Sequence, residues 1–364
     1  VVTVNNVAPT IEVLDATVAI DEAGAVTVTA IFDDVPADSH RVEIAWGDGS
    51  LSTFIIPAGN KAFARTHFFY DDDPTATPSD GVDIRVRVTD DDRGVATGSV
   101  TTTVHNLAPT DVELDVKPGS PGTSTIVEGD NTSFRVSWSD AGSNDSHTVS
   151  VDWGDGTSDS VVVVDGRRSL DLVHRFIDDD PSDTSRDIYD IAVTVTVDDT
   201  GAAAITVPVT VENAAPSLFG PAGNISLRLN DITTTDDDGV DEDAPLTLRG
   251  LLADDGFADD HIVTIDWGDG TNDTVEVTPS GERYRFFEAT HRYADDNPSG
   301  TPADIYTVAV TATDDDGEIA QAELDVEVRD VAPLVLPAGA QAVQYSDPIA
   351  EIVFVAVDVV GDDL

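Results

Sequence analysis

Short stretches of the chain alternate polar and apolar residues with a period of two. Residues 41–46 (Arg-Val-Glu-Ile-Ala-Trp) show this pattern, and the stretches 148–153, 262–267 and 306–312 repeat it. Because successive side chains of a β-strand point to opposite faces, this period predicts strands with one buried face. No stretch of 12 residues keeps the period of a helix. We therefore predict an all-β chain of short antiparallel strands packed as β-sandwiches, with a core tryptophan in the third strand of each.

The sequence repeats itself around the motif Trp-Gly-Asp-Gly-Ser/Thr, which begins at Trp46, Trp153 and Trp267. An aspartate lies 13 residues before each tryptophan, another lies eight before it, and a histidine lies six before it. These residues are Asp33, Asp38 and His40, then Asp140, Asp145 and His147, then Asp254, Asp259 and His261. Each repeat continues with a second histidine (His67, His174, His291), an acidic loop with proline (71–74, 178–181, 295–298) and a closing acidic cluster with glycine (90–94, 198–201, 314–317). This register indicates one structural unit used three times.

A short proline-containing connector separates the repeats. It reads Asn-x-Ala-Pro at 6–9, 106–109 and 213–216, and Asp-x-Ala-Pro at 330–333. Proline fixes its own φ and favours an extended residue before it, so these connectors are expected to be stiff. We predict the last strand of a preceding module at 1–6, a first repeat at 7–106, a second at 107–213, a third at 214–330, and the start of a further Ig-like module at 331–364.

These motifs resemble a known family. The Trp-Gly-Asp-Gly-Ser/Thr turn, the Asp-Ser-His at 38–40 and 145–147 and the closing Asp-Asp-Asp-Gly at 314–317 look like PKD domains, the seven-stranded Ig-like modules of microbial surface and secreted proteins. The resemblance covers about 7–330. It implies tandem Ig-like antiparallel β-sandwiches arranged as an extended rod, on the cell surface or outside the cell.

The charge of the chain excludes several classes of partner. The sequence holds 57 Asp and 14 Glu against 16 Arg and 2 Lys, so its net charge is −53. Such a surface repels nucleic acid and anionic membranes. No apolar run is long enough for a membrane span in this segment. The chain has no methionine and opens within a strand pattern, so we expect an internal piece of a longer protein.

The absence of cysteine removes disulfides and thiolate metal sites. Such an acidic, cysteine-free composition is typical of a secreted or surface protein in a salty or calcium-containing medium. The solvated acidic surface of a halophilic protein would look similar.

The acidic loops are the candidate chemistry of this chain. In an Ig-like sandwich the loops before the third strand and after the sixth lie at the end where the chain enters, and the acidic loop with proline lies at the end where it leaves. Each junction would then bring together carboxylates from two neighbouring repeats. Carboxylates a few Å apart repel one another unless a cation neutralises them. Hard oxygen ligands favour Ca²⁺, which also occupies such loops in some members of the resembled family.

The candidate Ca²⁺ ligands form two sets. Those at the end where the chain enters are Asp33, Asp34, Asp38, Asp90 and Asp91 in the first repeat, Asp140, Asp145, Asp198 and Asp199 in the second, and Asp254, Asp255, Asp259, Asp314 and Asp315 in the third. Those at the end where the chain leaves are Asp71, Asp72, Asp178, Asp179, Asp295 and Asp296.

Other interpretations of these acidic residues stay open. The aspartates of the Trp-Gly-Asp-Gly motif fit a structural turn as well as a metal site, and the acidic loops with proline fit a solvated surface. The extra acidic segment 236–243 only half matches a calcium loop. All six repeated histidines are interpreted as buried, hydrogen-bonded side chains rather than as ligands or bases.

The repetition argues against an enzyme, because each polar cluster occurs three times in equivalent loops and no catalytic motif is present. We expect a structural or adhesive segment of a large extracellular protein, whose partners are neighbouring modules of the same chain. Copies of itself and surface glycans or proteins are further candidates, as in a filament or surface layer. The alternative is a spacer or substrate-binding accessory of a secreted hydrolase.

Overall fold

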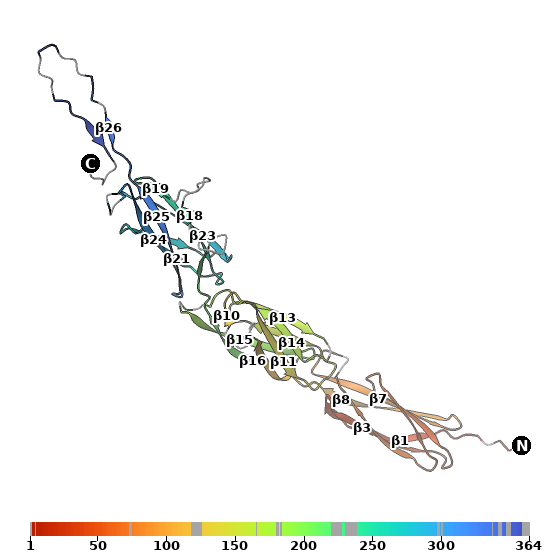
Figure 1. The fold of residues 1–364 in the computed structure, drawn as a ribbon. Coiled ribbons are helices and arrows are strands. Elements are labelled where there is room, and N and C mark those ends of the chain that lie inside the picture. Colours follow the sequence, from red (N-terminus) through yellow and green to blue (C-terminus); the bar gives the residue numbers. More distant parts are fainter. Residues whose placement is uncertain are drawn as a thin grey trace. The chain divides into compact units, whose positions relative to one another are not determined.

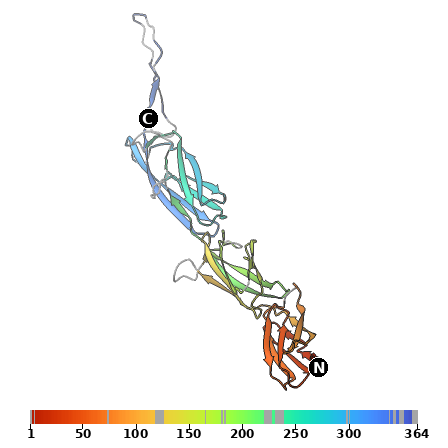
Figure 2. The same ribbon diagram turned by 90° about the vertical axis from the view of Figure 1, so that its right-hand side faces the viewer.

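The computed structural model describes residues 2–3, 5–72, 75–117, 126–164, 166–179, 182, 184–219, 228–229, 239–296, 299, 301–336, 338–340, 344–346 and 351–358. Within these ranges the regular secondary structure is entirely β-strand, as the alternation predicts, and no ribbon in Figure 1 or Figure 2 is coiled. The described residues form no helix that is long and apolar enough to cross a membrane.

The strands of the first repeat form two sheets. One has the order β1-β3-β6 and the other the order β2-β8-β7-β4-β5. The strands are β1 (Thr10–Ala16), β2 (Ala19–Asp21), β3 (Ala25–Asp33), β4 (His40–Ala45), β5 (Leu51–Ile56), β6 (Ala62–Phe68), β7 (Ser79–Asp90) and β8 (Val95–His105).

The strands of the second repeat follow the same plan, with sheets β14-β11-β9 and β10-β16-β15-β12-β13. Their bounds are β9 (Thr110–Lys117), β10 (Ile126–Val127), β11 (Thr132–Ser139), β12 (His147–Asp152), β13 (Ser158–Val163), β14 (Ser169–His174), β15 (Arg186–Val197) and β16 (Ala202–Glu212).

In the third repeat, β20 pairs with β17, β18 and β23, and the second sheet has the order β19-β25-β24-β21-β22. A separate hairpin, β26-β27, follows. The bounds are β17 (Ser217–Phe219), β18 (Arg228–Leu229), β19 (Gly239–Asp241), β20 (Leu246–Ala253), β21 (His261–Asp266), β22 (Asn272–Val277), β23 (Tyr284–His291), β24 (Ala303–Asp314), β25 (Ile319–Arg329), β26 (Leu334–Leu336) and β27 (Val355–Val357).

This strand order is that of tandem Ig-like sandwiches. The structure adds one parallel pairing to each of the predicted antiparallel sandwiches. The chain leaves the first sheet after β1 and joins the second as β2, which pairs in parallel with β8. The equivalent pairs β10–β16 and β19–β25 are also parallel. The alternation gives no signal for this pairing, because it shows which face of a strand is buried but not the direction of its neighbour.

The apolar positions predicted from the alternation fill the cores. Val42, Ile44 and Trp46 are at most 1% exposed and belong to one cluster of buried side chains. Trp46 lies just beyond β4 and stacks on His67, with ring centroids 4.8 Å apart. Gly47 follows with a φ of 98°, and a Cβ there would overlap the Val82 side chain. The motif therefore needs glycine both for its turn and for its close packing.

The chain forms two compact units. The first comprises residues 1–124, 132–174 and 189–209, and the second comprises residues 125–131, 175–188 and 210–364. The division runs through the second repeat, because its segments 125–131, which contain β10, and 175–188 belong to the same unit as the chain that follows residue 210. Each side-chain cluster described below lies within one of these units.

Candidate metal centres

In the first unit, three carboxylates from two successive repeats converge. Glu22 follows β2, and Asp140 and Asp145 lie in the loop between β11 and β12. Their nearest oxygens are all within 4.8 Å of one another, and we name them the Glu22 cluster. Two oxygens that bind one ion at about 2.4 Å cannot be farther apart than about 4.8 Å, so this spacing is compatible with a shared Ca²⁺.

In the Glu22 cluster only Asp140 is ion-paired within the described residues, through its contact with His147 at 2.5 Å. Oε1 of Glu22 accepts a hydrogen bond from the backbone N–H of Leu107 at 2.8 Å. Within the described residues, Oε2 of Glu22 and both carboxylate oxygens of Asp145 are buried without a hydrogen-bond partner. Burial, followed by the charges of neighbouring aspartates, raises the pKa of Glu22 to about 8 and that of Asp145 to about 7.

The space around this cluster excludes a side chain at Gly142, which lies in the same loop. A Cβ at Gly142 would overlap Oε2 of Glu22 and both oxygens of Asp145. The loop therefore approaches the two carboxylates with bare backbone, which leaves their oxygens facing one another.

A second group in the first unit, the Asp72 cluster, consists of Asp71, Asp72 and Asp199, with oxygens within 4.8 Å of one another. The first two follow β6, and Asp199 lies in the turn between β15 and β16. Asp72 is fully buried, and burial together with the charge of Asp199 raises its pKa to about 7. The connector contributes as well, because Nδ2 of Asn106 donates to the backbone carbonyl of Asp199.

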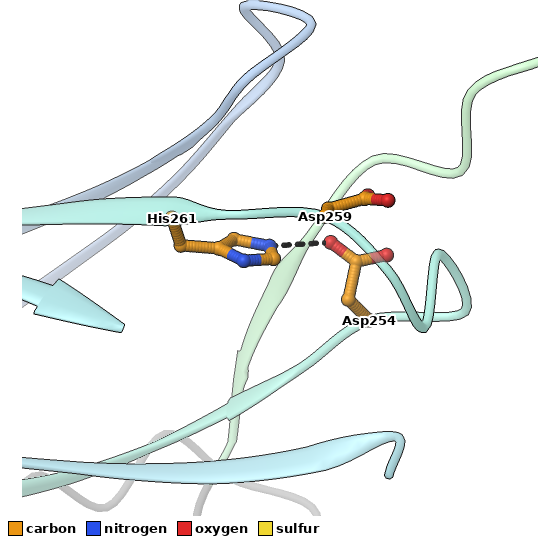
Figure 3. Close-up of side chains that lie close together, drawn as sticks. All are labelled: Asp254, Asp259 and His261. Carbon is orange, nitrogen blue, oxygen red and sulfur yellow. Dashed lines mark hydrogen bonds and ion pairs between the residues drawn. The ribbon is translucent and has the colours of Figure 1, made fainter. Parts of the chain in front are cut away.

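In the second unit, Asp254, Asp259 and His261 form the Asp259 cluster, with ligand atoms within 4.8 Å of one another. Figure 3 shows the Asp254 carboxylate bonded to the imidazole of His261 at 2.7 Å, while Asp259 takes no part in that bond. Asp259 is 1% exposed, and neither of its oxygens has a partner among the described residues. Burial and the charge of Asp254 raise the pKa of Asp259 to about 8.

The protonation of His261 follows from its neighbours. Nη1 of Arg285 donates to Nδ1 of His261 at 2.8 Å. Because a guanidinium only donates, Nδ1 must be the acceptor, and the ring proton of the neutral imidazole sits on Nε2 and is donated to Asp254. Asp254 is thereby satisfied by the protein, and Asp259 is the carboxylate of this cluster that is left for a cation.

The Glu128 cluster consists of Glu128, Asp178 and Asp179, and it is close enough to the Asp259 cluster for the charges of Glu128 and Asp259 to interact. Oε1 of Glu128 accepts the backbone N–H of Ala214 at 2.8 Å, as Glu22 does from its own connector. Burial, followed by the charges of Asp259 and Asp179, raises the pKa of Glu128 to about 9. Its Oε2 is buried without a partner in the described chain.

Asp179 repeats the arrangement of Asp72. It is fully buried and interacts with Asp316, which lies in the turn between β24 and β25. Burial and the neighbouring carboxylate raise the pKa of Asp316 to about 8. Strand pairing makes this residue the equivalent of Asp199, because His147 pairs with Val197 and His261 pairs with Asp314.

The first repeat corrects one predicted equivalence. The offset from the tryptophan matches Asp33 with Asp140 and Asp254, but it is Asp34 that bonds to the repeated histidine, His40, at 2.8 Å. The loop before β4 is one residue shorter here, so the spacing shifts by one. The exposed carboxylate of Asp33 instead binds Nζ of Lys61 at 2.5 Å. Asp34, Asp38 and Asp90 form the cluster of this repeat.

The other predicted residues have identifiable contacts. The closing clusters use one aspartate per repeat to accept a backbone N–H of the facing loop, and these are Asp91, Asp198 and Asp315. Asp255 is ion-paired with Arg283 at 3.1 Å. Asp314 accepts a hydrogen bond from Nδ2 of Asn213. Asp295 and Asp296 lie after β23, where Asp296 is buried.

Some of the predicted acidic positions cannot be placed. Asp73, Asp180 and Asn297, with the prolines that follow them, lie outside the described residues, and so does the part of the acidic segment at 236–238.

The Trp-Gly-Asp-Gly aspartates act as turn residues. Oδ1 of Asp155 accepts hydrogen bonds from the backbone and hydroxyl of Thr157, and Oδ2 bonds to His174 at 2.7 Å. His174 in turn stacks on Trp153 with centroids 4.3 Å apart. The first and third repeats have the same contacts. These contacts support the structural interpretation of the aspartates. His67, His174 and His291 are hydrogen-bonded as predicted, but they are half-buried rather than buried.

Sequence reasoning missed Glu22, Glu128, Glu242 and Asp316. The three glutamates lie 24 or 25 residues before the tryptophans, and each accepts the backbone N–H that follows a connector asparagine or aspartate. Glutamate is scarce in this chain, so its recurrence 24 or 25 residues before each tryptophan was the available signal. Asp316 was missed because the closing clusters were aligned by their first aspartate rather than by strand register.

The donor set fits a hard divalent cation. Most of the converging atoms are carboxylate oxygens, and several are buried without a partner in the part of the chain that the structure describes. Burial of such a charge costs several kcal/mol per ion when it is not compensated. Ca²⁺ accepts six to eight oxygens in flexible geometry, whereas Zn²⁺ prefers nitrogen and sulfur.

Comparison with known proteins gives only distant likeness. No family model matches the chain, and no curated protein matches it. Among solved structures, the chain is similar to a tetra-tandem repeat from the extending region of a large adhesion protein, with 14% identity over 88% of this chain and 74% of that chain and a TM-score of 0.37. It is also similar to a 1.5-MDa bacterial ice-binding adhesin, with 16% identity over 89% of this chain and 97% of that chain and a TM-score of 0.24.

A third similar structure is a two-domain fibronectin type III segment from chicken tenascin, with 15% identity over 55% of this chain and 98% of that chain and a TM-score of 0.29. All three TM-scores are low, and the Ig-like fold is assigned here from the strand order of the chain itself.

Proposed function

We propose that this chain is a non-enzymatic structural segment of a large extracellular adhesive protein, built from PKD-type Ig-like repeats joined by Ca²⁺. The repeats are 7–106, 107–213 and 214–330, preceded by the last strand of one module and followed by the start of another. Arranged as a rod, they would display an adhesive region away from the cell or assemble into a surface layer.

One observation carries this proposal. At two successive connectors a buried glutamate of one repeat lies near a buried aspartate of the next. Oxygens of Glu22 and Asp145 are within 4.8 Å of one another, and the charge of Asp259 acts on Glu128. Within the described residues neither aspartate has a hydrogen-bond partner for its carboxylate oxygens. Ionised carboxylates in such places destabilise the protein unless a cation joins them. In the proposal Ca²⁺ is held by the Glu22 and Asp72 clusters in the first unit and by their equivalents in the second. It supplies positive charge next to carboxylate oxygens that have no hydrogen-bond partner within the described residues.

The extracellular location fits the same chemistry. Extracellular modules bind Ca²⁺ with dissociation constants of about 10⁻⁴–10⁻³ M, which suits the concentrations outside cells. A chain with 71 acidic residues and no cysteine is suited to that environment. The threefold repetition of the clusters supports a structural role, since catalysis needs one asymmetric site.

Calorimetry of the whole chain tests the proposal. Ca²⁺ should raise the melting temperature, EDTA should reverse the change, and Mg²⁺ at the same concentration should have a smaller effect, because it requires a tighter octahedral shell. Solution scattering should give a longer maximum dimension with Ca²⁺ than with EDTA. Melting curves and scattering profiles that Ca²⁺ leaves unchanged would refute the proposal.

A further inference from the structure

The outer face of the β5-β4-β7-β8 sheet in the first repeat carries a groove of about 670 Å³. We name it the arginine groove. It is far larger than a single ion needs, and its volume lies within the usual range of about 300–1,000 Å³ for small-molecule sites. Its polar lining consists of Glu43, Arg85, Arg87, Thr97 and Ser99.

The charge of this groove is the opposite of that of the chain. Arg41, Arg85 and Arg87 point to the same sheet face as one acidic side chain, Glu43, although arginine makes up only 16 of the 364 residues. Arg85, Arg87 and Glu43 line the groove, whereas Arg41 lies outside the lining. Asp83 lies two residues before Arg85, but it is bonded by Thr101 and is not part of the lining.

The other repeats carry no such charge at the equivalent positions. In the first repeat Arg85 pairs with Ala45 and Arg87 pairs with Glu43. Strand pairing places Ala192, Thr194 and Ser150 at the positions of Arg85, Arg87 and Glu43 in the second repeat, and Ala309, Thr311 and Thr264 in the third. The sandwich therefore does not require arginine at these positions, which argues against a purely structural role.

The arginines are positioned for a planar anion. Glu43 holds Arg41 at 2.9 Å and Arg87 at 3.2 Å, which fixes their guanidinium groups. Arg85 is exposed and has no hydrogen bond or ion pair within the described chain. A guanidinium presents a rigid fork of donors that matches the two oxygens of a carboxylate.

We propose that the arginine groove binds an acidic sugar, with the carboxylate on Arg85 and Arg87. The hydroxyls of Thr97 and Ser99 and the carboxylate of Glu43 are positioned at the groove wall to bond sugar hydroxyls. Leu51 and Ala45 add apolar surface for the ring. The ligand is thus a uronic or nonulosonic acid unit at the end of a glycan, and the site would be an adhesive one.

Charge selects this ligand over larger anions. A second copy of the chain carries −53, and long-range repulsion opposes its approach. A nucleic acid or a polyuronate meets the same repulsion along its length. A ligand with a single carboxylate is attracted by the positive charge of the groove, and the negative charge of the rest of the chain repels it less than it repels a larger anion.

Titration of the full chain with glucuronic acid, N-acetylneuraminic acid and neutral glucose tests the proposal, with binding followed by ligand-observed NMR. We expect an acidic sugar to bind with a dissociation constant in the millimolar range and glucose not to bind. Arg85→Gln and Arg87→Gln should each weaken binding by about tenfold or more. Arg249→Gln removes an equally exposed arginine from the third repeat and should change nothing.

Each variant is first checked by its melting temperature in Ca²⁺, so that unfolding is not mistaken for lost binding. Equal binding of glucose and the acids, no binding of either acid, or unchanged binding by Arg85→Gln would overturn the proposal. Self-association that Arg85→Gln abolishes would assign the groove to a second copy instead. The Ca²⁺ proposal is measured separately by melting, so either proposal can fail alone.

Discussion

Replacing Asp259 with asparagine distinguishes the metal-free form of the Asp259 cluster from the Ca²⁺-bound form that we propose. The substitution keeps the shape of the side chain and removes its charge. Without a divalent ion, the buried carboxylate of Asp259 has no partner in the described chain and faces Asp254 and Glu128, so it destabilises the folded protein. With Ca²⁺ bound, the same carboxylate becomes a ligand. The variant should therefore be more stable than the parent in EDTA and gain less from Ca²⁺.

The magnitudes follow from burial and mass action. At 1% exposure Asp259 has almost no contact with water, and removing an unpaired buried charge should stabilise the metal-free protein by about 1–3 kcal/mol at pH 8. At tenfold excess over its dissociation constant, one lost Ca²⁺ removes about 1.4 kcal/mol. Each effect corresponds to a shift of several degrees in the transition of a 100-residue domain, about 4–8 °C per kcal/mol.

Differential scanning calorimetry of the parent and variant in EDTA and in Ca²⁺ gives the four melting temperatures that are needed. Glu276→Gln is the control, because it removes one charge from an exposed position of the same repeat. At pH 5 the gain in EDTA should shrink, since the raised pKa of Asp259 leaves the parent carboxylate protonated. The account is wrong if Asp259→Asn is less stable than the parent in EDTA at pH 8, or if it retains the full response to Ca²⁺.

Three further predictions address other parts of the account. In EDTA the pKa values of Glu128 (about 9) and Asp259 (about 8) are raised, so the folded state binds more protons than the unfolded state above about pH 4. The melting temperature should therefore fall as the pH rises from 5 to 9. A melting temperature that rises over this range would contradict the prediction. Gly142→Ala, whose Cβ overlaps the Glu22 cluster, should reduce the Ca²⁺-induced gain of the first unit by about 1.4 kcal/mol. Gly81→Ala is the control and should not change this gain, because its Cβ would make only an ordinary contact of 3.8 Å with Thr101. Asp155→Ala should cost about 1–2 kcal/mol through its lost turn and histidine bonds, equally with and without Ca²⁺, and a loss of Ca²⁺ response would restore the metal interpretation of this motif.

The fold was largely predictable because strand burial has a period that a single sequence displays. The alternation at 41–46 placed Val42 and Ile44 in the core without any knowledge of pairing. The parallel strand β2 was not predictable, because the three residues Ala19–Asp21 are too few to show a period. Its switch between sheets is a tertiary event, set by packing against β8.

The sequence predicts that the candidate sites lie in aspartate-rich loops, but it does not predict which carboxylates form them. Clusters of aspartate mark the loops, yet sequence spacing cannot tell which carboxylate a histidine or an arginine already satisfies. Asp254 is paired with His261, whereas Asp259, five residues later, is not. The loop before β4 is also one residue shorter in the first repeat than its equivalent in the second. The aspartate that bonds the repeated histidine, Asp140 in the second repeat, is therefore Asp34 and not Asp33 in the first. Single glutamates such as Glu22 carried no local signal, because their neighbours in the site come from another repeat.

A crystal structure of the full chain grown in Ca²⁺, with anomalous scattering used to identify the ions, is the most direct test of whether cations join successive repeats. We predict ion density between Glu22 and Asp145 and between Glu128 and Asp259, with carboxylate oxygens at about 2.3–2.6 Å from each ion. Ordered carboxylates at these positions with only water or direct carboxyl hydrogen bonds between them would contradict the account.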